Sequence, residues 1–247
     1  MNRIADFAID QAMHVIARIV TGNRLRTVAQ GLENLPANGP AIIAARHYHH
    51  LFDGLAFFAA VERRFHIVVT LDWAQSRRSK FLLSTLNRLA RWPMVLREDA
   101  LLSGETEHRT LFKPSDLPRY QLAALRQSVK LLGEKRLLII FPEGYPNIDP
   151  IYTPKTGADE FLPFKPGFAV IAERAERITN QSIPIIPAGI TYQIGATWLA
   201  QLNFGLPVYR REFPSRQQLI EHVAGAVKQL CAVQIKIEHD GKLDPHN

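Results

Sequence analysis

A cluster of histidines with one carboxylate, in the stretch RHYHHLFDG at residues 46–54, holds the residue types best suited to proton transfer. Its candidate groups are His47, His49, His50 and Asp53. A histidine titrates near neutral pH, so it can take up a proton and return it. A carboxylate bonded to one ring nitrogen fixes the tautomer and stabilises the imidazolium that forms. Because no serine or cysteine nucleophile lies nearby, the simplest chemistry is general-base activation of a substrate hydroxyl.

The same four side chains could instead bind a metal ion. His49 and Asp53 are four positions apart, which places two ligands on one face of a helix. However, the sequence contains no H-E-x-x-H pattern and no matching second cluster. A metal-dependent hydrolase is therefore the alternative from another class.

Further polar residues lie next to predicted strands and helices. Glu143 and Gly144, in the sequence FPEG, follow an apolar run; Glu143 either contacts a substrate hydroxyl or is a buried carboxylate that accepts backbone N–H bonds. Arg97 follows another such run, where it either binds a phosphate through its planar fork or is an ordinary surface arginine. Lys165 is a second phosphate candidate because it precedes a predicted helix, and helix N-termini attract anions.

Strands and helices are predicted to alternate along the chain. Strands are predicted at 41–45, 65–71, 93–96 and 136–141, within 182–192, and after 233. Helices are predicted from Asp53 to about 64, at 79–90 and 119–134, from Pro166 onward, and at 215–233, with loops at 98–118 and 145–163. The pattern indicates an α/β fold, a single domain with a central mixed sheet flanked by helices.

Two inferences follow from this order of elements. Ligands gather at the carboxyl ends of strands in open α/β sheets, so His47, Arg97 and Glu143 are expected to converge. Pro184 and Pro187 lack the N–H that a sheet ladder needs, so their strand is expected at an edge or a bulge.

Residues 1–26 are predicted to form an N-terminal amphipathic helix apart from the main domain at 27–247. Within 4–20, polar residues recur every three or four positions and form one narrow stripe, while the rest of the helix surface is apolar. This wide apolar face, followed by Arg24 and Arg26, predicts a helix at a membrane surface. Packing against the domain core is the alternative. No signal peptide is expected, because Asp6 and Asp10 interrupt the apolar region.

The formal net charge of +7 favours an anionic partner. A cluster of basic residues comprises Arg77, Arg78, Lys80, Arg88 and Arg91. Nucleic acid is not expected as the partner, since no such motif is present and aromatic residues are not interleaved with the basic ones. Cys231 is the only cysteine, which excludes an internal disulfide and suits a reducing compartment.

The segments, in their order along residues 27–210, resemble the glycerolipid acyltransferases of the lysophospholipid acyltransferase superfamily, of the 1-acylglycerol-3-phosphate acyltransferase type. GPAIIAARH and the following Asp53 resemble the first family motif, and PMVLR, ending at Arg97, resembles the second. FPEG matches the third, FKPGFAVIA resembles the lysine–glycine segment after it, and IPIIPAGI resembles the fourth.

The resemblance implies an enzyme whose acyltransferase domain spans 27–247. It would move a fatty acyl group from acyl-CoA or acyl-ACP to a hydroxyl of a lysophospholipid, with 1-acylglycerol 3-phosphate the leading acceptor and another lysolipid or a neutral glycerolipid the alternatives. It implies no cofactor beyond the thioester co-substrate, no metal, and a peripheral or monotopic place on the cytoplasmic face of a membrane. His47 would be the base and Asp53 would orient it, while the acceptor would meet Arg97, Glu143, Gly144 and Lys165.

Two departures from the family pattern affect the site. The family motif has four residues between histidine and aspartate, but His47 lies six positions before Asp53, and Tyr48 occupies the usual place. His47 is favoured as the base because it directly follows the predicted strand, with His49 or His50 as the alternative. In addition, Tyr145 and Pro146 follow FPEG where the family has threonine and arginine, which leaves the acceptor lipid open.

Overall fold

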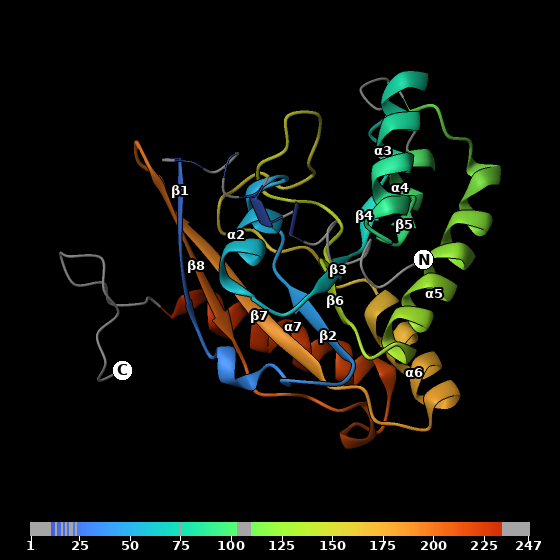
Figure 1. The fold of residues 1–247 in the computed structure, drawn as a ribbon, viewed down its shortest axis with the longest axis vertical. Helices are drawn as coiled ribbons and strands as arrows, with labels where there is room; N and C mark the ends of the chain where they lie inside the picture. Colours follow the sequence, from blue (N-terminus) through green and yellow to red (C-terminus); the bar gives the residue numbers. More distant parts are fainter. Residues whose placement is uncertain are drawn as a thin grey trace.

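The computed structural model describes residues 24–74, 76–102 and 110–233, together with residues 11, 12, 14, 15, 17, 19 and 22. Within them, six strands form one sheet in the order β1-β8-β7-β2-β6-β3, and two short strands pair separately as β4-β5 (Figure 1). The strands are β1 (Leu25–Gln30), β2 (Ala41–Ala45), β3 (Phe65–Ile67), β4 (Val69–Thr70), β5 (Met94–Val95), β6 (Leu137–Ile140), β7 (Ile185–Gln193) and β8 (Trp198–Phe204). The helices are α2 (Phe52–Ala60), α3 (Arg77–Leu89), α4 (Glu98–Leu102), α5 (Leu117–Gly133), α6 (Gly167–Thr179) and α7 (Arg216–Ala232), with 3-10 turns η1 (Leu32–Asn34), η2 (Pro114–Asp116) and η3 (Arg210–Glu212).

The predicted α/β fold with a central mixed sheet is confirmed. β7 and β8 run antiparallel, whereas the other neighbouring strands of the large sheet run parallel. Helices cover both faces of the sheet: α2 packs on one side, and α5, α6 and α7 pack on the other (Figure 1).

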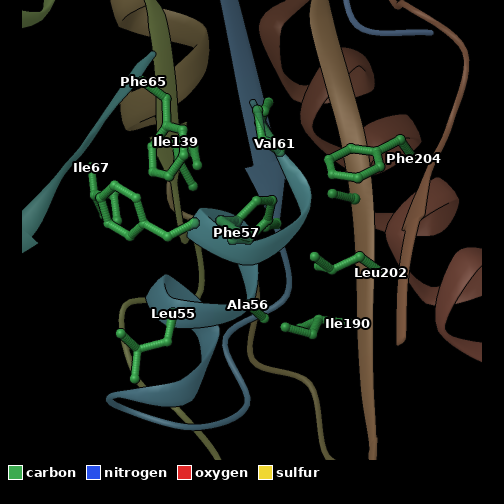
Figure 2. Packing of buried hydrophobic residues seen from close by; sticks show 14 of the residues in the cluster. Leu55, Ala56, Phe57, Val61, Phe65, Ile67, Ile139, Ile190, Leu202 and Phe204 are labelled. Atoms are coloured by element: carbon green, nitrogen blue, oxygen red, sulfur yellow. The ribbon is translucent and has the colours of Figure 1, made fainter. Parts of the chain in front are cut away.

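β2 connects the two hydrophobic cores because its side chains alternate between the faces of the sheet. Ile43 enters the core under α2, while Ile42 enters the core shared with α6 and α7, and both are fully buried. Figure 2 shows Phe57 of α2 facing the sheet, with Ile139 on one side and Leu202 on the other. A strand buried on both faces fixes the position of whatever follows its carboxyl end.

Of the edge strand or bulge predicted at Pro184 and Pro187, the edge strand is wrong and the bulge is confirmed: Ala188 pairs with Phe204 but Ile185 pairs with Val208, so two residues of β7 face three residues at 205–207. β7 lies inside the sheet between β2 and β8, and its register is regular with β2 throughout and with β8 from Ala188 to Gln193. Pro184 precedes the strand. Pro187 lies just beyond the last β7–β8 pair, Ala188 with Phe204, and its carbonyl accepts a hydrogen bond from Gly205. Its missing N–H therefore falls inside the bulge, between the Ala188–Phe204 pair and the isolated Ile185–Val208 pair.

Other boundaries also differ from the prediction. The strand predicted at 65–71 is two short strands, β3 and β4, which belong to different sheets. The loop predicted at 98–118 begins with α4 and already contains η2 and the first residues of α5, while residues 103–109 lie outside the described part. β1 and β8 were not predicted, and the strand predicted after 233 lies outside the described residues.

Much of the predicted N-terminal helix lies outside the described residues. Of the residues described there, Ala17 is buried in the core under α2, and His14 Nδ1 lies 2.9 Å from the carbonyl oxygen of Phe58. Val15 and Ile19 are exposed. Among the helices that the structure describes, none is long and apolar enough to cross a membrane.

Candidate active site

The end of β2 and the first turn of α2 bring His47 and Asp53 together. His47 lies two positions after β2, and Asp53 is the second residue of α2. His47 Nδ1 is 2.8 Å from Asp53 Oδ2, and the imidazole stacks on the Phe141 ring with centroids 4.4 Å apart. The histidine side chain is 17% exposed, so it is positioned by the protein and still reachable from solvent.

Asp53 is held by three further hydrogen bonds inside the protein, and its side chain is 1% exposed. Tyr48 N–H donates to Oδ2 at 2.7 Å, while His49 N–H and the Tyr192 hydroxyl donate to Oδ1 at 3.0 and 2.8 Å. Burial, followed by the charge of Asp53, raises the pKa of Tyr192, so its hydroxyl stays protonated and donates. Because an ionised carboxylate only accepts, His47 Nδ1 is assigned as a donor, which leaves Nε2 with its lone pair.

Five residues separate His47 from Asp53, one more than in the family motif. A short β-bridge to Ile148 holds the backbone of this longer segment. Ile148 N–H donates to the Tyr48 carbonyl at 2.7 Å, and His50 N–H donates to the Ile148 carbonyl at 3.1 Å. The backbone of residues 48–50 is thereby fixed, with the N–H groups of Tyr48 and His49 directed at Asp53. The longer spacing is thus compatible with the His47–Asp53 hydrogen bond.

His49 is bonded differently from His47. Its Nδ1 accepts the N–H groups of Leu51 and Phe52, each at 3.2 Å, at the start of α2. Burial and then the neighbouring His50 lower the pKa of His49 to about 4, so the ring is neutral near pH 7. Since Nδ1 accepts, the proton of His49 is on Nε2. His50 is exposed, and its Nδ1 lies 3.4 Å from the Ile148 carbonyl.

Glu143 and Lys155 hold the backbone of His47 from both sides. Glu143 is fully buried; its Oε1 accepts the His47 N–H at 3.0 Å, and its Oε2 accepts the Leu162 N–H at 2.9 Å. Lys155 Nζ lies 2.7 Å from Glu143 Oε2 and donates to the His47 carbonyl at 2.9 Å. Burial lowers the pKa of Lys155, an effect that Glu143 opposes. The carboxylate expected to contact the acceptor is therefore engaged with the main chain that carries His47.

Arg97 is buried in an ion pair. It follows β5 and is 8% exposed, so it is not an ordinary surface arginine. Its Nε and Nη2 lie 2.7 and 2.6 Å from Asp72 Oδ2, and its Nη1 donates to the Gly144 carbonyl at 3.1 Å. The guanidinium also lies over the Tyr145 ring, 3.9 Å from its centroid. Arg97 thus fixes the turn that carries FPEG.

Gly144 and Lys165 complete this edge of the site. Gly144 has φ of 78°, a left-handed conformation that favours glycine, and its N–H donates to the Phe141 carbonyl at 3.0 Å. A Cβ at this position would lie 3.4 Å from Lys165 Nζ. Lys165, two positions before α6, forms a 3.0 Å ion pair with Asp99, and both side chains are about half exposed at 47% and 50%. Lys165 is thus the accessible cation beside the turn.

Three polar residues of the site were not predicted from the sequence: Asp72, Lys155 and Tyr192. Asp72 directly follows the apolar run at 65–71, the same place relative to a strand that singled out His47, so a signal for it existed. Tyr192 ends the predicted strand at 182–192 with a polar group. Lys155 lies in a segment without a regular pattern and has no such signal. Among the residues the structure describes, no group of three or more His, Cys, Asp or Glu is arranged to hold a metal ion.

Comparison with known proteins assigns the chain to a family. A family model described as Acyltransferase matches residues 26–191, a range that includes every site residue above except Tyr192. The chain belongs to the acyltransferase family. Among solved structures, it is similar to the 1-acyl-sn-glycerophosphate (LPA) acyltransferase PlsC from Thermotoga maritima, with a TM-score of 0.56 and 18% identity over 91% of this chain and 77% of that one. This likeness concerns the fold. No curated protein matches the sequence significantly.

Proposed function

We propose that the protein transfers a fatty acyl group from an acyl thioester to a hydroxyl of a lysophospholipid at a membrane surface, with 1-acylglycerol 3-phosphate as the acceptor. The observation that carries this proposal is the 2.8 Å hydrogen bond between His47 and Asp53, at the carboxyl end of β2 in a chain of the acyltransferase family. The likeness to the Thermotoga PlsC fold supports the choice of acceptor.

In this reaction His47 is the general base. The acceptor hydroxyl bonds to Nε2, and its oxygen attacks the thioester carbonyl while Nε2 takes the proton. Asp53 stabilises the imidazolium through Nδ1–H. The tetrahedral intermediate, whose oxyanion needs N–H donors or a cation, then collapses; the C–S bond breaks and the thiolate leaves with the proton from Nε2. The sequence of steps uses no acyl-enzyme, no metal and no cofactor other than the thioester, acyl-CoA or acyl-ACP.

Lys165 is the residue we assign to the acceptor phosphate. Its pair with Asp99 is half exposed, and such pairs are worth only about 0–1 kcal/mol, so a phosphate can compete for the ammonium. Arg97 is already paired with Asp72 and acts on the acceptor mainly by holding the Gly144 carbonyl. Glu143 acts as a positioning residue through the His47 N–H.

The test is a thiol-release assay on the purified full chain. Acyl-CoA and acyl-ACP are each combined with 1-acylglycerol 3-phosphate, another lysophospholipid and a monoacylglycerol. We expect release that depends on the acceptor, is fastest with 1-acylglycerol 3-phosphate, and is lost in His47→Ala. Lys165→Met should raise KM for the phosphate acceptor and leave KM for the monoacylglycerol unchanged.

Other outcomes identify the alternatives. Preference for a neutral acceptor, with no effect of Lys165→Met, would point to a neutral glycerolipid. If thiol is released without any acceptor, and if a chelator abolishes this release, the result would favour a metal-dependent hydrolase. Full activity in His47→Ala would remove His47 from the role of base.

A further inference from the structure

The outward face of α3 is apolar, although a surface helix ordinarily turns its apolar face inward. Leu82, Leu86 and Leu89 follow the i, i+4, i+7 spacing of one helical stripe and are 58%, 52% and 48% exposed. Phe81, on the neighbouring row, is 74% exposed. These four residues form what we call the α3 apolar face.

Contacts on the opposite side of α3 fix this orientation. Leu83 packs against a small core that contains Leu71, Leu96 and Phe112. Asn87 is 9% exposed, and Lys80 Nζ lies over the Phe112 ring, 3.9 Å from its centroid. A lysine and an asparagine therefore face the domain while leucines face outward. These contacts fix the rotation of α3 about its axis, so its leucines are held facing outward.

Basic residues surround the α3 apolar face. Arg77, Arg78 and Arg88 are exposed, and the helix, RRSKFLLSTLNRL, contains no acidic residue. On a helical wheel Arg78 lies between Phe81 and Leu89, so cations and apolar groups alternate across one surface. Helices that lie in a membrane interface combine leucine and phenylalanine with lysine and arginine in this way, because apolar groups enter the acyl boundary while cations meet anionic headgroups.

We propose that the α3 apolar face, with Arg77, Arg78 and Arg88, docks on an anionic phospholipid surface. The charge of this face selects the occupant, since each exposed cation on it matches a phosphate-rich surface. α3 also lies near the candidate site: Asp72, the partner of Arg97, is five residues before Arg77, at most about 18 Å of extended chain. Figure 1 shows α3 at the margin of the molecule, and Leu83 of α3 and Leu101 of α4 pack against the same small core. Asp99 of α4 pairs with Lys165. If the proposed lipid acylation holds, docking through α3 brings the acceptor side of the site to the membrane.

Vesicle co-sedimentation of the full chain tests this surface. We expect binding to phosphatidylcholine vesicles that contain phosphatidylglycerol, weak binding to phosphatidylcholine alone, and loss of binding at high salt. Leu82→Ser/Leu86→Ser should weaken partitioning at least about tenfold, because two half-exposed leucines no longer enter the interface. Arg78→Gln and Arg88→Gln should each weaken it about fivefold. The matched controls are Ile178→Ser, 73% exposed on α6, and Arg174→Gln on the same helix, which should bind as the unaltered protein does.

A site-specific label separates docking by α3 from docking by another part of the chain. In a Cys231→Ala background, an environment-sensitive fluorophore on Leu82→Cys should shift to the blue on vesicles, whereas one on Ile178→Cys should not. No shift at position 82, or a shift already present without vesicles because the chain itself covers the face, would overturn the proposal, as would unchanged binding of the leucine variant.

The outcome is distinguishable from failure of the proposed reaction. His47→Ala should bind vesicles as the unaltered protein does, since it lies outside the α3 face. Vesicle binding that depends on α3 without any thiol release would leave the surface standing and remove the reaction. Thiol release, together with vesicle binding that the α3 variants do not change, would support the reaction and overturn the α3 surface.

Discussion

His47 Nδ1 lies 2.8 Å from Asp53 Oδ2, although the two residues are six positions apart and the family motif places them five apart. The carboxylate is buried and accepts from Tyr48, His49 and Tyr192 as well, so it has little freedom to move. The ring is oriented by Asp53 rather than the reverse. The pair is therefore sensitive to any change that converts Asp53 from an acceptor into a donor.

Asp53→Asn should abolish most of the activity while preserving the fold. The amide is nearly the size of the carboxylate, but its NH2 group meets donors, and the neutral side chain favours the wrong His47 tautomer. We expect kcat to fall by about 10⁴, the loss seen when the orienting carboxylate of a serine protease is replaced in this way. Thiol release measures the effect, and Asp159→Asn, on an exposed loop, is the control. Activity within tenfold of the unaltered protein would contradict the assigned role of Asp53.

Replacing His49 distinguishes a structural histidine from the base. His49→Asn should retain kcat within about tenfold, because an asparagine oxygen can accept the N–H groups of Leu51 and Phe52 as His49 Nδ1 does. His49→Ala should lose about 1 kcal/mol of unfolding free energy, the usual cost of removing such an acceptor at a helix start. Chemical denaturation and thiol release are measured on both variants. If His49→Asn were inactive while His47→Asn kept its activity, His49 would be the base.

The sequence predicts the strands and helices whose own residues carry a clear apolar run or a clear helical spacing. The run AIIAA predicts β2, and the proline and apolar spacing of FKPGFAVIAERA predict α6, because each pattern is local. β1 has only one buried residue, Leu25, and the buried residues of β8 include Gln201 and Asn203. Neither strand therefore forms an apolar run in the sequence. Pro187 correctly predicts the bulge but not the central position of β7, because a local pattern does not encode the order of the strands.

The candidate site likewise contains residues that the sequence predicts and partners that it does not predict. His47, Arg97 and Glu143 follow strands, and the structure brings His47 and Glu143 into contact through the His47 N–H. Their partners are set by contacts distant in sequence: Lys155 meets the His47 carbonyl across 108 positions, and Tyr192 meets Asp53 across 139. Such pairs depend on how the strands are ordered, which no local pattern encodes.

Lys155→Met should be strongly destabilising. It leaves Glu143 charged, buried and without its cation, and removing one partner of a buried pair costs about 3–5 kcal/mol. Lys155→Met/Glu143→Gln should recover part of that loss, because no unpaired charge is left. The control is Lys165→Met, whose exposed pair with Asp99 is worth about 1 kcal/mol or less. Urea denaturation at neutral pH measures all three. If Lys155→Met and Lys165→Met lost the same unfolding free energy, the Lys155–Glu143 pair would contribute no more than an exposed pair.

His66 should make the fold sensitive to acid. It is 1% exposed in β3, and its Nδ1 lies 3.0 Å from the Ala90 carbonyl. Its Nε2 is buried without a hydrogen-bond partner among the residues that the structure describes. Burial is the main cause that lowers the pKa of His66 from 6.5 to about 4. A proton on Nε2 would therefore be a buried, unpaired charge.

The unfolded chain accordingly binds a proton between about pH 6.5 and 4 that the folded chain does not. The contribution of His66 to stability is present above pH 6.5 and is lost as the pH falls toward 4. Linkage gives about 2 kcal/mol between pH 7.5 and 5. Denaturation at the two pH values should show a decline that is smaller by about this amount in His66→Gln than in the unaltered protein. His222→Gln, exposed on α7, should decline as the unaltered protein does. Because each variant is compared with itself at two pH values, a general loss of stability in His66→Gln cancels, and an unchanged decline would contradict the lowered pKa.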